Sequence, residues 1–153
     1  AENTIPALRL YRETFRPSTV LDKPYAMIGV SVICAESDDE GQRLAAPGIL
    51  SFVRLRSGRP GLLPTPHEAA EYQFTPSERR IVESRRSGQV VGGADAVRRR
   101  LDDLLAETDA DELMVTTMVY DQADRLRSYA RLAELAGLEG LSRAPGARPA
   151  ATA

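Results

Sequence analysis

Four polar residues that could contact a ligand stand together at the end of one apolar stretch: Thr116, Thr117, Tyr120 and Asp121. Their hydroxyl and carboxylate groups can hold a substrate or cofactor by hydrogen bonds. If the stretch before them is a strand of a parallel sheet, they lie at its carboxyl end, where α/β folds bind ligands. The structural alternative is that Tyr120 ends the strand and Asp121 caps the next helix. The sequence assigns no catalytic residue among them.

A second candidate site is the pair Gly92 and Gly93, which precedes a helix predicted over 94–107. Free N–H groups at a helix start can bind an anion, so the pair is a candidate phosphate-binding site. A plain turn is the alternative reading. The longer patterns GxGxxG and GxxxxGK[ST] are both absent from the sequence.

The residues most often used as metal ligands or nucleophiles are scarce. His67 is the only histidine and lies in a proline-rich segment, which favours a solvated loop residue. Cys34 is the only cysteine and lies in an apolar run, which favours a core position. One Cys and one His cannot build a zinc site of the usual type, so we expect no metal.

Two near-continuous apolar runs indicate the strands that would position these groups. They cover residues 25–35 and 111–121. Runs without polar alternation are typical of strands buried on both faces, which belong to parallel sheets covered by helices. The fold class predicted is therefore α/β.

Capping and periodicity predict the helices. Pro47 should kink or break one of them near Ala45 and Ala46, because proline removes a helical hydrogen bond. The predicted helices begin near Asn3 or Thr4, at the capping boxes 37–40 and 75–78, at 94 and at Asp121, and the last ends at Gly137.

Two segments are predicted to lack such order. Residues 58–75 are rich in proline and glycine and read as a mobile lid loop. Residues 138–153 have too little apolar content to fold and are predicted to be a disordered tail. The folded unit would then span 1–137.

Composition limits the function classes. The chain has 153 residues, 42% of them hydrophobic, and a net charge of −2 with interspersed signs, which argues against nucleic-acid binding. A single cysteine fits a reducing, cytoplasmic setting. No apolar segment approaches about 18 residues, so no membrane span is expected.

Four segments together resemble the carboxyl-terminal part of the luciferase-like monooxygenases, the bacterial-luciferase-like flavin-dependent oxidoreductases. The segments are 7–18, 24–30, 90–93 and 110–115, in family order, within a likeness that covers roughly 1–137. The resemblance implies a (β/α)8 TIM-type barrel that uses reduced FMN, or in one branch the deazaflavin F420, with O2 on a small organic substrate. It places 25–35 as the seventh strand and 111–120 as the eighth.

The same resemblance implies that the chain is a part of the family's barrel. A complete barrel takes about 250 residues, and the chain opens with Ala1 rather than Met. We therefore expect a fragment that is inactive alone and associates as a homo-oligomer or with another barrel segment. Gly93-Ala94 stands where the family often has Ser or Thr followed by Pro, which leaves a poorer helix cap.

Two alternatives come from other functional classes. One is a non-catalytic remnant or subunit that acts through association with another chain. The other is a small nucleotide-binding α/β domain that uses Gly92 and Gly93.

Overall fold

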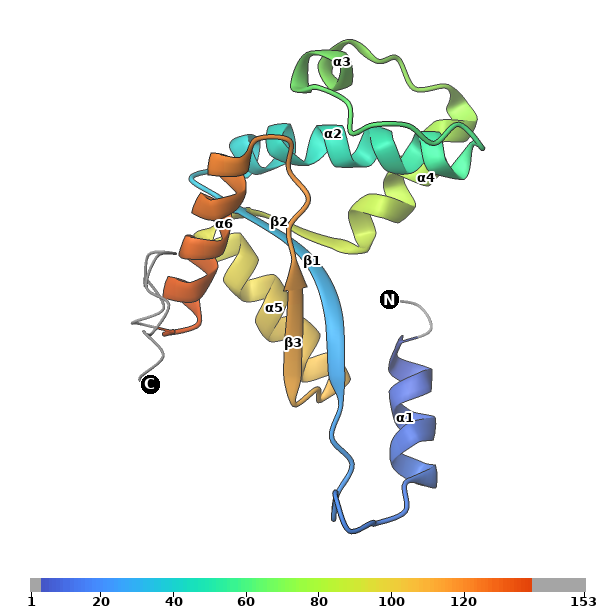
Figure 1. Ribbon diagram of the computed structural model, residues 1–153, viewed down its shortest axis with the longest axis vertical. Helices are drawn as coiled ribbons and strands as arrows, with labels where there is room; N and C mark the ends of the chain where they lie inside the picture. Colours follow the sequence, from blue (N-terminus) through green and yellow to red (C-terminus); the bar gives the residue numbers. More distant parts are fainter. Residues whose placement is uncertain (1–3, 139–153) are drawn as a thin grey trace, which may run out of the picture.

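A computed structural model describes residues 4–138 (Figure 1). Residues 139–153, which include nearly all of the tail predicted at 138–153, lie outside the described part. The elements, in chain order, are α1 (Thr4–Thr14), β1 (Met27–Ala35), α2 (Asp38–Arg56), α3 (Pro66–Glu71), α4 (Pro76–Ser87), β2 (Gln89–Gly93), α5 (Ala94–Thr108), β3 (Glu112–Thr116) and α6 (Gln122–Leu135). The predicted α/β class is confirmed.

The three strands form one parallel sheet in the order β2-β1-β3. The upper half of β1 pairs with β2, where Ala35 lies opposite Gly93. Its lower half pairs with β3, where Met27 lies opposite Glu112. The stretches expected as seventh and eighth strands are thus neighbours. The described strands make an open sheet, and closure into a barrel is not seen in residues 4–138.

The prediction that both strands are buried on both faces holds only for the carboxyl end of β1. Residues 32–35 are fully buried, whereas Met27 and Gly29 are exposed. The prediction is wrong for β3, which covers only Glu112–Thr116 and alternates between exposed and half-buried residues. The reason is position: among residues 4–138, β3 has a single neighbouring strand, and one of its faces carries no covering helix.

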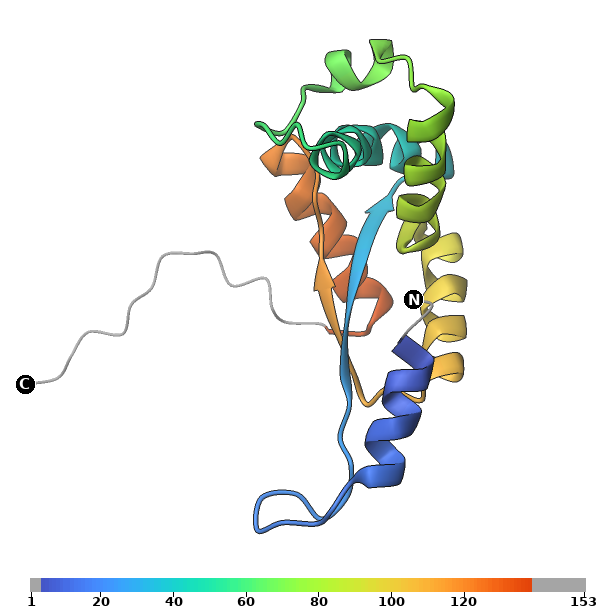
Figure 2. The ribbon, with the colours of Figure 1, turned by 90° about the vertical axis from the view of Figure 1, so that its right-hand side faces the viewer.

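Each face of the sheet packs differently. One face, with Val30, Val32 and Cys34, packs against α5 and α6 through Val97 and Leu132. The other face is covered only near the carboxyl ends of the strands, where Ile33 packs with residues of α2 and α4 and with Val119. Figure 2 shows α2 lying across the upper end of β1, with the lower part of the strand beyond its reach.

The predicted capping explains where the helices begin. The Ser37 side chain accepts a hydrogen bond from the Glu40 N–H at the start of α2. Thr75 and Glu78 form the predicted capping box of α4, and α5 covers the residues that its apolar periodicity indicated. Of the kink or break predicted near Ala45 and Ala46, the break does not occur, because α2 continues through Pro47, and the kink stays a prediction. That proline is fully buried, so tertiary packing outweighs one lost hydrogen bond.

The segment predicted as a lid loop contains a helix that the sequence reading missed. α3 begins at Pro66 and is preceded by the N-cap residue Thr65, which forms a capping box with Glu68. The segment is tied to α4 by Glu78, whose carboxylate accepts hydrogen bonds from Arg59 Nη2 at 3.0 Å and the Tyr72 hydroxyl at 2.9 Å. The mobility of 58–75 stays a prediction.

Candidate functional site

The residues predicted to contact a ligand at the carboxyl end of the strand differ in how far they are buried. Thr117 lies one residue beyond β3 and is only 7% exposed. Its hydroxyl donates a 2.7 Å hydrogen bond to the Val32 carbonyl, and its N–H donates to the Tyr129 hydroxyl at 3.1 Å. These contacts fasten the chain after β3 onto β1 and α6, and they leave the Thr117 side chain in the core.

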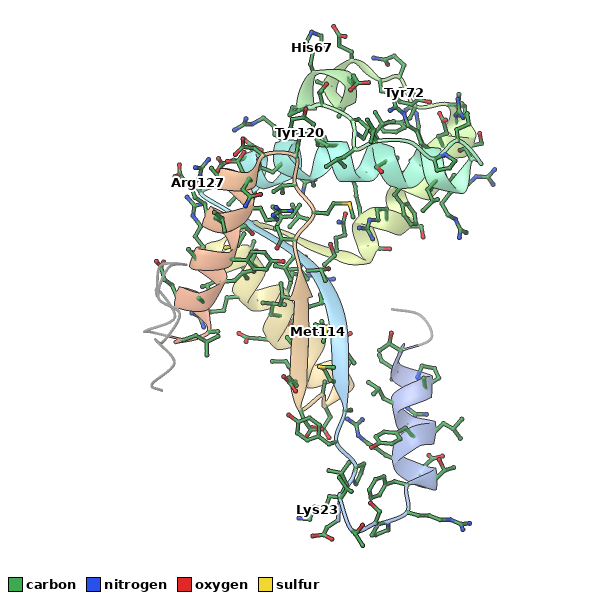
Figure 3. The ribbon with its side chains drawn as sticks, in the orientation of Figure 1. Lys23, His67, Tyr72, Met114, Tyr120 and Arg127 are labelled. Carbon is green, nitrogen blue, oxygen red and sulfur yellow. The ribbon has the colours of Figure 1, made fainter. Side chains whose placement is uncertain are left out.

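Asp121 performs the structural role that the sequence offered as an alternative. Its Oδ1 accepts hydrogen bonds from the N–H groups of Ala123 at 2.8 Å and Asp124 at 3.1 Å, so it caps α6. Tyr120 beside it is half exposed above the sheet (Figure 3). The ligand roles of both residues stay predictions.

At the candidate phosphate-binding site, Gly92 and Gly93 lie against the carboxylate of Asp38. The Gly93 N–H donates a 2.8 Å hydrogen bond to Asp38 Oδ1, from the first turn of α2. At Gly92, where φ is +159°, an added Cβ would lie 2.6 Å from the same oxygen. A phosphate at this helix start would therefore have to displace Asp38.

A surface that the sequence reading did not single out lies on the uncovered side of the sheet. We call it the open face and define it by Met27, Gly29, Ser31, Met114 and Thr116. Residues two apart in a strand share a face, and the register sets Gly29 beside Met114 and Ser31 beside Thr116. Figure 3 shows Met114 on this side, in front of β3.

Polar side chains cross the open face in one row. Gln89 of β2 and Thr116 of β3 are the two register partners of Ser31 in β1. Gln89 Nε2 donates a 3.2 Å hydrogen bond to Ser31 Oγ. Gln89 Oε1 is buried and has no hydrogen-bond partner among residues 4–138. No sequence motif marks Ser31 or Gln89, because only strand pairing brings them together across 58 residues.

Cys34 lies in the core as expected, whereas His67 is exposed as expected but lies on α3 rather than in a loop. The His67 side chain is 74% exposed and lies 3.1 Å from Glu71 on α3. Cys34 is fully buried, and burial raises the pKa of its thiol, which keeps it from acting as a ready nucleophile. In the part of the chain that the structure describes, no cluster of three potential metal ligands occurs, and no helix is long and apolar enough to cross a bilayer.

Comparison with known proteins shows which proteins the chain is similar to. No family model matches the chain. A protein of Escherichia coli (strain K12) named luciferase-like monooxygenase is 41% identical over 123 residues, which make up 80% of this chain and 37% of that protein. The chain is a relative of the luciferase-like monooxygenases.

Other similar proteins give the same picture. The uncharacterized protein YvbT of Bacillus subtilis (strain 168) is 41% identical over 87% of the chain and 40% of its own length. The crystal structure of apo-MsnO8 superposes with a TM-score of 0.72 at 35% identity, covering 89% of this chain and 42% of that one. This luciferase-like chain thus spans about two fifths of the length of the relatives it matches.

Proposed function

We propose that the protein to which this chain belongs is a flavin-dependent oxidoreductase of the luciferase-like monooxygenase type. It would use reduced FMN, or F420 in its place, with O2 to oxidise a small organic substrate in the cytoplasm. The observation that carries this proposal is the 41% identity to the E. coli luciferase-like monooxygenase. The chain would form the carboxyl-terminal strands of a (β/α)8 barrel.

When bound, the reduced flavin supplies the electrons for the reaction with O2, and the protein supplies binding, orientation and exclusion of water. The chain's residues suit the ring of such a cofactor better than its phosphate. The open face offers hydroxyl groups beside uncovered apolar surface, whereas the Gly93 N–H is already paired with Asp38. Tyr120 and Thr116 would line the pocket above the strands, and Asp121 and Thr117 would hold the backbone that carries Tyr120.

The test uses the complete polypeptide with a flavin reductase that supplies reduced FMN under air. Substrate-dependent oxygen insertion, followed by mass spectrometry of products from a panel of small organic compounds, is expected. Reduced F420 provides the parallel arm. If the complete polypeptide binds neither oxidised FMN nor F420, the proposal is refuted.

A second candidate is a non-catalytic subunit that associates with another chain or with a second copy. The observation in its favour is the open face together with β3, which within the described part of the chain has a neighbouring strand on one side only. Light scattering on the purified chain tests it. If the isolated chain forms a stable dimer that binds no flavin, the subunit is favoured. If the isolated chain is a monomer that binds no FMN, and the complete polypeptide does bind FMN, the enzyme is favoured.

A further inference from the structure

The paired strands β1 and β3 part at the carboxyl end of the sheet. Their register ends at Ser31 and Thr116, while β1 continues to Ala35 beside β2. Residues 32–35 of β1 are fully buried, so their backbone groups on the β3 side need other hydrogen-bond partners. Thr117 and the helix α6 supply two of these partners.

Two adjacent residues of α6 take part in this replacement. Ser128 Oγ accepts a 2.9 Å hydrogen bond from the Cys34 N–H, and both residues are fully buried. The Tyr129 hydroxyl accepts a hydrogen bond from the Thr117 N–H, and the Thr117 hydroxyl donates to the Val32 carbonyl. Each contact joins two residues of this chain, so the arrangement does not depend on what covers the open face.

Beyond Thr117 the chain leaves β3 and runs to α2 (Figure 1). Val119 is 4% exposed and belongs to the buried cluster that α2 forms with the end of β1. A Cβ added at Gly48 of α2 would lie 3.4 Å from the Met118 carbonyl oxygen, so the two backbones are close. The chain is thus fixed on both sides of Met118, by α6 before it and by the core after it.

Tyr120 follows this fixed stretch and is 50% exposed, at the place where the proposed cofactor pocket lies. A tyrosine side chain is rigid, with two rotatable angles. The Tyr129 hydroxyl therefore sets the distance between α6 and the backbone that leads to Tyr120. Because Tyr129 is 39% exposed, water can reach the Thr117 N–H when that hydroxyl is removed, so the backbone can shift without unfolding.

We propose that Tyr129 is a positioning residue of the flavin site, whose hydroxyl holds the backbone after β3 so that Tyr120 stands at one distance from the bound ring. This inference rests on the proposed function and adds to it a residue of a covering helix that does not touch the ligand. The buried contact between Ser128 and Cys34 fixes α6 against β1, and Tyr129 transmits that fixed position to Tyr120.

The experiment measures the fluorescence lifetime of oxidised FMN, and in parallel of F420, bound to the complete polypeptide. A phenol ring close to an excited flavin shortens this lifetime, and the effect falls steeply with distance. Tyr120→Phe should therefore lengthen the lifetime. Tyr129→Phe should lengthen it as well, because Tyr120 is then no longer held at one distance, and it should raise the Kd by about threefold to tenfold, the size of one hydrogen bond.

The double variant decides whether Tyr129 acts through Tyr120. In the Tyr120→Phe background, Tyr129→Phe should leave the lifetime at the value that Tyr120→Phe alone produces. An equal lengthening in both backgrounds would show that Tyr129 acts directly on the ligand, and the inference would be overturned. A lifetime that stays the same in Tyr129→Phe, or in Tyr120→Phe, would also overturn it while the proposed function stands.

Tyr11→Phe is the matched control. The Tyr11 hydroxyl also accepts a hydrogen bond from a backbone N–H, that of Tyr25 at 3.3 Å, but near the amino end of β1. This variant should leave the lifetime and the Kd unchanged, and thermal melting shows that each variant is folded. If the unaltered polypeptide binds neither FMN nor F420, both the inference and the proposed function are overturned.

Discussion

The Asp38 carboxylate accepts a 2.8 Å hydrogen bond from the Gly93 N–H and so links the first turn of α2 to the start of α5. Two successive strand-to-helix connections are thereby held together at the carboxyl end of the sheet. The contact leaves no room for a side chain at Gly92, where a Cβ would also lie 3.2 Å from the Ala96 Cβ.

Gly92→Ala should therefore lower the free energy of unfolding by about 1–3 kcal/mol, the usual cost of overpacking. Urea denaturation measures it. In an Asp38→Ala background the cost of Gly92→Ala should be smaller, because the oxygen 2.6 Å away is gone. Gly29→Ala is the matched control and should cost nothing, since the space there is open. Equal costs at the two glycines would contradict the contact.

The neighbours Thr116 and Thr117 should respond in opposite ways. Thr117→Val leaves the buried Val32 carbonyl without its donor and should cost about 1–3 kcal/mol of stability. Thr116→Val changes an exposed side chain and should stay within about 0.5 kcal/mol. Chemical denaturation of both variants tests the pair. If Thr116→Val lowered the stability and Thr117→Val left it unchanged, the burial described for the two residues would be contradicted.

Substitutions at Tyr120 and Asp121 distinguish a role in ligand binding from a role in stability. Asp121→Ala removes two hydrogen bonds to α6 and should cost about 1 kcal/mol, whereas Asp121→Asn should retain most of that stability. Tyr120→Phe should leave the melting temperature nearly unchanged, because the ring is half exposed, while it lowers turnover of the complete enzyme. A large loss of stability with normal turnover would remove Tyr120 from the site.

Glu78 should make stability depend on pH. Hydrogen bonds from the Thr75 N–H and then from the Tyr72 hydroxyl hold the pKa of this carboxyl below its usual range. A folded-state pKa lowered in this way stabilises the fold above the unfolded value, about 4.3, and that stability is lost as the pH falls through the folded value. The difference in melting temperature between the unaltered protein and Glu78→Gln should therefore be full at pH 7 and shrink below about pH 4. Glu83→Gln, exposed on the same helix, is the matched control for the change in net charge.

Trypsin should cut at Arg59 before it cuts at Arg99, because 58–75 has few apolar anchors, whereas Arg99 lies within α5. Since Arg59 is bound to Glu78, the variant Glu78→Ala should speed this cleavage. Peptide mapping over time gives the order. Earlier cleavage within 94–107 would contradict the lid assignment.

Local sequence signals predicted the parts of the fold that depend on neighbouring residues. The capping residues Ser37, Thr75 and Asp121 all cap their helices, because a short polar side chain and the N–H groups of the next turn are sufficient for this contact. The strand 111–121 was misjudged because apolar content does not reveal how many neighbours a strand has. Ser31, Gln89 and Thr117 acquire their partners only through strand pairing, and the contact of Thr117 spans 85 residues.

All three methionines of the chain, Met27, Met114 and Met118, are about half exposed: 49%, 52% and 48%. A thioether in such a position is open to oxidants, and methionine sulfoxide is polar where methionine is apolar. If the proposed function holds, the reduction of O2 would generate oxidants close to the open face. Sulfoxide at Met27 and Met114 would then make that face polar, while the buried core stays unaltered. An ageing preparation is therefore expected to lose activity and keep its melting temperature, and methionine sulfoxide reductase should restore the activity.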